Sequence, residues 1–257
     1  MRKYVCMAAI VLTAAGSAIA APITPSFDDF GELAPATFGG DGIPNDPVAI
    51  TTIIDGGNTI TLGLASHGRF ANPDQGNDGA GTYFARTGSN FGDPTFVTMP
   101  SSSLGATWNV NFYIDIAGGG SFDDYIIELV YDFDPAAGTD ETDHGVLDFN
   151  GAITALGGDP ALVSFTEGSE NLLFSFFADG GLPFITVPTP GSFDPSAIGE
   201  YSLALIVRDT GGSELGRSAI HVLTTPEPST MALLGMGGIG LALGGYRRRR
   251  NRNRTAA

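Results

Sequence analysis

Hydrophobic and polar residues alternate along several short segments of the chain. The clearest segment is 107–116, in which every second residue is apolar. Successive side chains of a β-strand point to opposite faces, so this pattern predicts an antiparallel strand with one face in a core and the other in water. The apolar face would carry Trp108, Val110, Phe112, Ile114 and Ile116, and the other face Thr107, Asn109, Asn111, Tyr113 and Asp115.

Turn-forming residues separate these segments and predict how they are joined. Clusters of Gly, Asp and Asn between two alternating segments are typical of β-hairpins. The predicted hairpins join 48–54 to 59–64 through 55–58, 107–116 to 124–133 through the glycines 118–120, and 201–207 to 218–222 through 209–213. The apolar run 172–177 predicts a further strand, buried in the core.

No segment outside the two termini shows a sustained helical period, and the 37 Gly and 16 Pro interrupt the chain too often for a helix bundle. We therefore predict an all-β fold, an antiparallel two-sheet β-sandwich of the immunoglobulin-like or jelly-roll kind. One domain would span residues 21–223. A break near 151–160, which would divide the chain into two small sandwiches, is the alternative.

The first 20 residues have the layout of a secretory signal helix. Arg2 and Lys3 precede an apolar stretch at 5–15, which is too short to span a bilayer. Ala18 and Ala20 place small residues at the two positions that signal peptidase reads, so Ala21 would begin the mature chain. Because Cys6 is the only cysteine and is removed with the signal, the mature protein would have no disulfide bond.

Residues 224–257 combine three features in a fixed order. Pro226, Glu227 and Pro228 form a stiff polar segment. An uncharged apolar stretch then begins at Met231 and ends at Tyr246, and as a helix it would rise about 24 Å, short of the roughly 30 Å of a hydrocarbon core. The basic run that follows would stay on the cytoplasmic side of the membrane; it comprises Arg247, Arg248, Arg249 and Arg250.

Together these three features resemble the PEP-CTERM sorting signal of Gram-negative bacteria. The resemblance implies that an exosortase-type protease of the inner membrane recognises Pro226-Glu227-Pro228, cleaves near it and releases the body. The protein would then be a transient inner-membrane intermediate with a short transmembrane helix, before it reaches the cell envelope or the extracellular medium. The stretches 39–46 and 77–82 also resemble blocks of PEP-CTERM proteins, and they imply no activity. A plain tail-anchored surface protein is the alternative.

Charge is distributed very unevenly between the body and the ends. Residues 21–225 contain 27 acidic residues, four arginines and no lysine. A surface of this kind repels phosphate backbones, which excludes nucleic acid as a partner. It is compatible with a soluble protein in an external medium.

The densest acidic region suggests one metal site. Asp132 and Asp134 share a predicted strand face, and the loop that follows would bring Asp140 and Asp143 towards them. Convergent carboxylates suit calcium, although the spacing does not match an EF-hand. Solvated acidic loops are the simpler alternative, so calcium is a possible cofactor and the sequence requires none.

The sequence contains little material for catalysis. The only histidines are His67, His144 and His221, which are scattered, and the common hydrolase and nucleotide-binding motifs are missing. We therefore expect no enzyme, and rank a secreted hydrolase last among the functions considered.

The expected function is that of an exported envelope or extracellular-matrix protein with a structural or adhesive role. A polysaccharide-binding module, with or without calcium, is the alternative, with exopolysaccharide as its partner. In that case Tyr83 and Tyr113 would be exposed on a sheet, whereas Trp108 would lie in the core.

Overall fold

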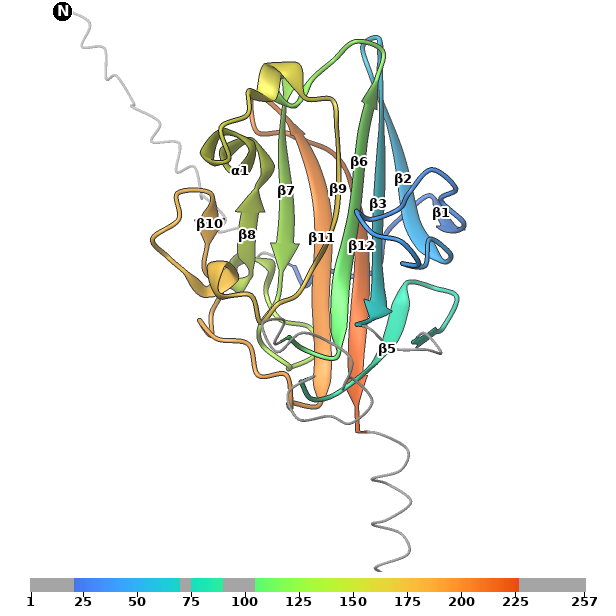
Figure 1. Ribbon diagram of the computed structural model, residues 1–257, viewed down its shortest axis with the longest axis vertical. Coiled ribbons are helices and arrows are strands. Elements are labelled where there is room, and N and C mark those ends of the chain that lie inside the picture. The colour runs from blue at the N-terminus through green and yellow to red at the C-terminus, as the bar shows by residue number, and fades with distance from the viewer. Residues whose placement is uncertain (1–20, 70–74, 90–104, 227–257) are drawn as a thin grey trace, which may run out of the picture.

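The computed structural model describes residues 21–69, 75–89 and 105–226. They form a mostly β structure with two sheets, drawn as two layers of long strands in Figure 1. The first sheet has the order β1-β2-β3-β6-β9, and all its neighbours are antiparallel. Its strands are β1 (Asp29–Gly31), β2 (Val48–Asp55), β3 (Asn58–Gly68), β6 (Trp108–Ala117) and β9 (Phe165–Glu170).

The second sheet has seven strands in the order β10-β8-β7-β11-β12-β5-β4. One pair, β12 with β5, is parallel, so the prediction of a purely antiparallel fold is wrong at this point. Its strands are β10 (Ile185–Thr186), β8 (Gly145–Asp148), β7 (Tyr125–Tyr131), β11 (Gly199–Asp209), β12 (Glu214–Thr225), β5 (Thr82–Arg86) and β4 (Gly76–Asn77).

Short helical turns connect the strands. The single α-helix among the described residues is α1 (Phe149–Ala155), which begins where the Asp148 side chain accepts a hydrogen bond from Asn150 N. It overlaps the predicted break at 151–160, and strands from both sides of that segment join both sheets. The 3₁₀ turns are η2 (Phe122–Asp124), η3 (Glu141–Asp143), η4 (Pro160–Leu162) and η5 (Ser175–Ala178).

Two of the three predicted hairpins are confirmed. Strands β2 and β3 pair up to Asp55 opposite Asn58, with Gly56 in the left-handed region at φ 58°. Strands β11 and β12 pair along nearly their whole length around the turn at 210–213. In both cases the turn residues and the two alternating segments are adjacent in sequence, so local chemistry determines the pairing.

The third predicted hairpin is wrong, because β6 and β7 belong to different sheets. The connecting glycines Gly118 and Gly119 adopt φ values of 110° and 100°, and the chain crosses from one layer to the other. The Asn58 side chain holds this crossing: its Oδ1 accepts from Gly120 N at 3.0 Å and its Nδ2 donates to the Tyr125 hydroxyl at 2.9 Å.

The apolar run 172–177 is also not a strand. The Oδ1 atom of Asn171 accepts hydrogen bonds from Ala106 N and Leu173 N, which turns the chain before it can extend. The run continues into η5, and Phe177 is nevertheless fully buried. Of the run predicted to be a buried strand, only Leu172 and Phe177 are buried, and the segment is not a strand.

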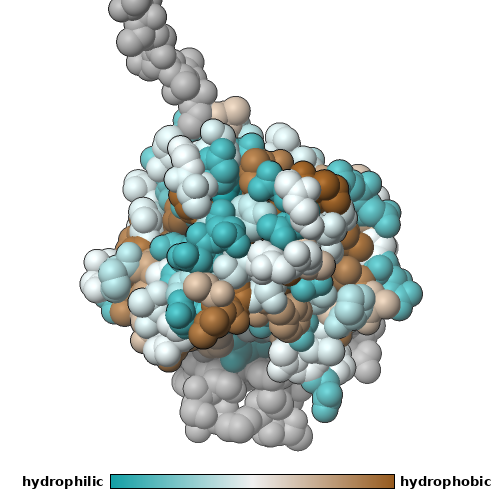
Figure 2. Space-filling model, turned by 90° about the horizontal axis from the view of Figure 1, so that it is seen from above, coloured by the Kyte–Doolittle hydropathy of each residue, from teal (hydrophilic) through white to brown (hydrophobic). Residues whose placement is uncertain are grey.

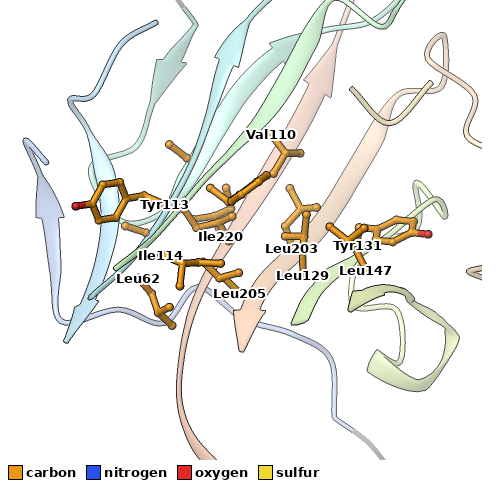
Figure 3. Close-up of a cluster of buried hydrophobic side chains, with 14 of the residues drawn as sticks. Leu62, Val110, Tyr113, Ile114, Leu129, Tyr131, Leu147, Leu203, Leu205 and Ile220 are labelled. Carbon is orange, nitrogen blue, oxygen red and sulfur yellow. The ribbon is translucent and has the colours of Figure 1, made fainter. Parts of the chain in front are cut away.

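The main core lies between the two sheets. Figure 3 shows Leu62, Val110 and Ile114 of the first sheet facing side chains of the second. Those opposite residues come from β7, β11 and β12, and include Leu129, Leu203, Leu205 and Ile220. All of these side chains are fully buried in one continuous cluster.

The outer face of the first sheet is covered as well. Glu167 on β9 accepts hydrogen bonds from the backbone N–H groups of Thr37 and Phe38, both at 2.8 Å, which ties residues 32–47 to the sheet. A Cβ on Gly63 would lie 2.5 Å from Leu33, so Leu33 packs directly on the backbone of β3. The prediction that 107–116 is half-buried is therefore wrong, and Tyr113 is only 5% exposed.

The outer face of the second sheet is partly covered by the first residues of the described chain. Ile23 is buried in a small cluster with residues of β7, β11 and β12, namely Val130, Ala204, Ile206 and Ala219. Ser26 exchanges two backbone hydrogen bonds with Ala219, at 3.0 and 2.8 Å. We call residues 21–27 the N-terminal segment.

Candidate functional site

The described residues end at Pro226, one residue after β12 and within the predicted processing segment 224–257. Strand β12 is held from both sides, because it pairs antiparallel with β11 and parallel with β5. Figure 1 shows the strand leaving the sandwich at one end of the molecule. Its final ladder positions place Thr224 opposite Gly199, and Thr225 opposite Arg86.

Thr224 anchors this end of the strand. Its side chain continues the buried face of Ile220 and Val222, and the residue is only 1% exposed. Its Oγ1 accepts a hydrogen bond from Gly199 N at 3.0 Å. The hydroxyl hydrogen is directed at the carbonyl oxygens of Ala197 (3.0 Å) and Gly199 (3.1 Å). A buried hydroxyl therefore has its donor and its acceptor capacity satisfied.

The neighbouring residue marks the end of the pairing. The carbonyl oxygen of Thr225 accepts a hydrogen bond from Thr87 N at 3.1 Å, while the residue itself is exposed. Pro226 follows, and because proline has no N–H group it cannot donate to a sheet ladder. We call Thr224, Thr225 and their partners Gly199, Ala197 and Thr87 the strand-end clamp.

Several residues of the predicted signals fall outside the described residues. They are Ala18 and Ala20 of the signal-peptidase site, Glu227 and Pro228 of the sorting segment, the apolar stretch from Met231 to Tyr246, and Arg247, Arg248, Arg249 and Arg250. Among the residues that are described, no helix is long and apolar enough to cross a membrane.

The four acidic residues considered for calcium do not converge on a site. Within the described part of the chain no three His, Cys, Asp or Glu side chains form a group that could hold a metal ion. Asp132 and Asp140 are used locally: Asp132 accepts from Asp134 N and Thr139 Oγ1, and Asp140 accepts from Thr142 N. The predicted gathering of Asp132, Asp134, Asp140 and Asp143 is therefore wrong.

Aspartates throughout the body share this local role. A carboxylate that accepts a hydrogen bond from the N–H two residues later closes a turn or caps a helix. At Asp140, the hydroxyl and the backbone N–H of Thr142 both donate to the carboxylate, and these two hydrogen bonds lower the pKa of Asp140. The same contact to the residue two positions on is made by Asp78, Asp132, Asp134, Asp140, Asp148, Asp159, Asp179 and Asp194.

One buried polar cluster was missed by the sequence reasoning. His144 Nδ1 lies 2.8 Å from the carbonyl oxygen of Asp140, which can only accept, so this nitrogen carries a hydrogen. His144 Nε2 lies 2.6 Å from Ser202 Oγ and 3.6 Å from Asp132 Oδ2. The three side chains come from separate segments that only the pairing of β7, β8 and β11 brings together.

This cluster contains the residue types of a hydrolytic triad without its geometry. In such a triad the acid and the serine bind opposite nitrogens of the imidazole. Here Ser202 and Asp132 both face Nε2, and all three residues are at most 5% exposed. The arrangement fits a structural polar cluster and gives a substrate no access to the serine.

Two of the arginines in the body are held in ion pairs. Arg217 contacts Glu141 at 2.9 Å and Glu214 at 2.6 Å, and the hydrogen bonds that it donates to the Glu214 carboxylate raise its pKa. Arg208 lies 3.3 Å from Glu128 and 3.5 Å from Glu214. These ion pairs neutralise charges locally and leave the net negative charge of the body unchanged.

The aromatic residues considered for polysaccharide binding are buried. Tyr83 is 2% exposed and donates a hydrogen bond to the carbonyl oxygen of Pro47 at 2.7 Å. Tyr113 lies against Phe165 beneath the cover formed by residues 32–47. The prediction that these two side chains are exposed is wrong, whereas Trp108, at 1% exposure, lies in the core as predicted.

Comparison with known proteins identifies one feature. The PEP-CTERM protein-sorting motif matches residues 224–250, so the match begins at the strand-end clamp and continues through the basic run. No curated protein and no solved structure matches the chain, and the choice between immunoglobulin-like and jelly-roll topology remains a prediction. The motif implies processing by an exosortase-type system and export by way of the envelope.

Proposed function

Because the chain carries a PEP-CTERM protein-sorting motif, we propose that it is a structural or adhesive protein of the cell envelope or extracellular matrix. In this proposal, signal peptidase removes residues 1–20 and an exosortase-type protease hydrolyses a peptide bond near Pro226-Glu227-Pro228. Water supplies the oxygen of the new carboxylate, and the released amine takes the proton. The single observation that carries the proposal is the sorting motif joined directly to the last strand of a folded β body.

The opposite end of the body provides a surface for contacts. Figure 1 shows η4 and the turn between β2 and β3 at the end away from the C-terminus of β12. Three exposed apolar side chains lie in or near these segments: Ile54 (70%) at the end of β2, Leu162 (84%) in η4, and Leu156 (89%), which follows α1. Figure 2, which views this end, shows hydrophobic residues in separate small groups among hydrophilic ones. Such a surface suits weak, repeated contacts better than one large permanent interface.

A non-catalytic role agrees with the geometry of the described residues. Among the described residues, the Ser202-His144-Asp132 cluster is buried without the geometry of a triad, and eight aspartates each hold a turn or a helix end. The burial of Tyr83 and Tyr113 removes the aromatic residues on which polysaccharide recognition would have relied. We therefore retain the structural or adhesive role and do not propose a polysaccharide-binding module.

The proposal is tested in a host that has an exosortase-type system. The intact mass of the protein from the envelope and the medium should correspond to loss of both the signal and the C-terminal segment. Replacing Glu227 and both prolines of the motif by alanine should leave the full C-terminus in place and retain the protein in the inner membrane. Accumulation of wild-type full-length chain in that membrane would contradict the proposal.

A further inference from the structure

Processing of a sorting motif requires that the protease reach an unpaired stretch of backbone. Residues inside a β-sheet are cleaved only after the strand detaches, because their N–H and C=O groups are already bonded to neighbouring strands. The matched motif begins at Thr224, although Thr224 and Thr225 still belong to β12. The structure therefore divides the motif into a part within the sheet and a part beyond it.

We propose that the strand-end clamp sets the N-terminal limit of exosortase cleavage, so that the mature protein keeps Thr225. The inference rests on the proposed function. It adds Thr224 as a positioning residue: the side chain acts through the backbone of the neighbouring segments and touches no reacting atom.

The clamp is built from both sides of the strand. On one side, Thr224 contacts the carbonyl oxygen of Ala197, in the loop before β11, and the N–H of Gly199, the first residue of β11. This loop is itself held by a turn, in which Asp194 accepts from Ser196 N through its side chain and from Ala197 N through its carbonyl oxygen. Contacts within the turn therefore hold the Ala197 residue independently of β12.

On the other side, the chain after β5 closes over the last residue of the strand. Thr87 N donates to the carbonyl oxygen of Thr225 at 3.1 Å, and the next residue, Gly88, donates through its N–H to the carbonyl oxygen of Pro195. Residues 87–88 thus connect the end of β12 with the loop that contains Ala197. Detaching Thr224 requires the loss of bonds to both segments.

A single substitution can weaken the clamp while leaving Pro226-Glu227-Pro228 unchanged. Thr224→Val keeps the branched shape and removes the hydroxyl, so Gly199 N and Ala197 O lose their partner in a buried site. Thr225→Val is the matched control: it changes the next residue, whose side chain is exposed and whose clamp contact is made by the backbone. Neither change touches Pro226, Glu227 or Pro228.

The first measurement is the intact mass of processed protein from the host. Wild type and Thr225→Val should end at or after residue 225, with less than a tenth of the product ending earlier. Thr224→Val should give at least a severalfold larger share of products that end before Thr225. A wild-type product that ends before Thr225, or a Thr224→Val product identical to wild type, would overturn the inference while leaving sorting intact.

The second measurement does not depend on processing. Hydrogen exchange on purified full-length chain should show strong protection for a peptide that covers 220–225, and Thr224→Val should accelerate its exchange about tenfold or more. Unprotected amides in the wild type would disprove the clamp. If the amides are protected but no chain is ever cleaved in the host, the clamp is supported as a structural element and the proposed function fails.

Discussion

The two ends of the described body are held in different ways. The N-terminal segment (residues 21–27) lies on the outside of the second sheet, where its main anchor is one buried side chain, Ile23. A few hydrogen bonds assist it, including one of 2.9 Å between His221 Nε2 and the carbonyl oxygen of Ile23. The C-terminal end is part of the sheet itself, with a neighbouring strand on each side of β12.

This difference has consequences for processing, since both ends adjoin a predicted cleavage site. Detachment of the N-terminal segment breaks the isolated bridge between Ser26 and Ala219, but it breaks no ladder between two strands of the sheet. The C-terminal end cannot detach in this way, because strand pairing and the clamp would both have to open. We therefore expect changes in the N-terminal segment to loosen that segment locally. Changes at the C-terminal end should instead lower the free energy of unfolding of the whole body.

The largest effect is expected at Gly199. A Cβ at this position would lie 2.0 Å from the carbonyl oxygen of Pro135, a backbone atom that cannot give way locally. Gly199→Ala should therefore lower the free energy of unfolding by about 3 kcal/mol or more, measured by urea denaturation. Gly57→Ala is the control, because no atom lies within 4 Å of the Cβ it would add.

An equal loss of stability in the two glycine variants would contradict this account of the C-terminal end. It would show that loss of backbone freedom, and not the close approach of Pro135, determines the effect. Because Gly199 N also donates to Thr224 Oγ1, Gly199→Ala should in addition increase hydrogen exchange in β12 near Thr224.

The next largest effect is expected at Ile23. Ile23→Ala removes the anchor of the N-terminal segment, a side chain that is 2% exposed, and should weaken the attachment of this segment to the sheet by about 2–3 kcal/mol. Hydrogen exchange should rise at Ser26 and Ala219, whose backbones are bonded to each other, while the amides of the strand-end clamp stay protected.

Ile54→Ala is the matched control for Ile23, because Ile54 is 70% exposed and its truncation should change stability by less than about 0.5 kcal/mol. Rapid exchange at both ends of the body in Ile23→Ala would show that the two ends open together. The contrast between a local N-terminal end and an integrated C-terminal end would then be wrong.

A smaller effect, which depends on pH, is expected at Glu170, a residue that belongs to neither end of the body. Burial at the end of edge strand β9 raises the pKa of Glu170 to about 7. Folding therefore favours the protonated carboxyl, so this group's contribution to stability falls as pH rises from the ordinary carboxyl range to about 7. Glu170→Gln should raise the free energy of unfolding by about 2 kcal/mol at pH 8, and the gain should nearly vanish at pH 4.5.

Urea denaturation of wild type and Glu170→Gln across this range checks the effect. A gain that is independent of pH would show that the glutamine acts through packing. Glu167 on the same strand is the natural comparison, because bonds from Thr37 and Phe38 stabilise its charged form and its pKa is lowered.

Sequence reasoning succeeded where the partners are close along the chain. The hairpins of β2 with β3 and of β11 with β12 follow from turn residues between two alternating segments. It failed where partners are distant: β7 pairs with β11 and not with β6, and β5 lies parallel to β12. Alternation shows that a strand has a buried face, but it does not show which strand lies beside it.

The same reason explains the outcome for the candidate sites. The calcium prediction relied on a count of nearby carboxylates, and the structure uses them one at a time in turns. The Ser202-His144-Asp132 cluster had no local signal, because its members meet only through strand pairing. Thr224 did have a local signal, because it extends by one step the alternation of buried residues that includes Ile220 and Val222.

The sequence by itself determined the sorting motif and the six longest strands, because both depend on short runs of neighbouring residues. Only the tertiary structure decided which sheet faces are covered. Residues 32–47 bury Tyr113, and Ile23 covers the small side chains of the second sheet. It also decided where the folded body ends, since the partners of Thr224 come from loops about 25 residues or more away in the chain.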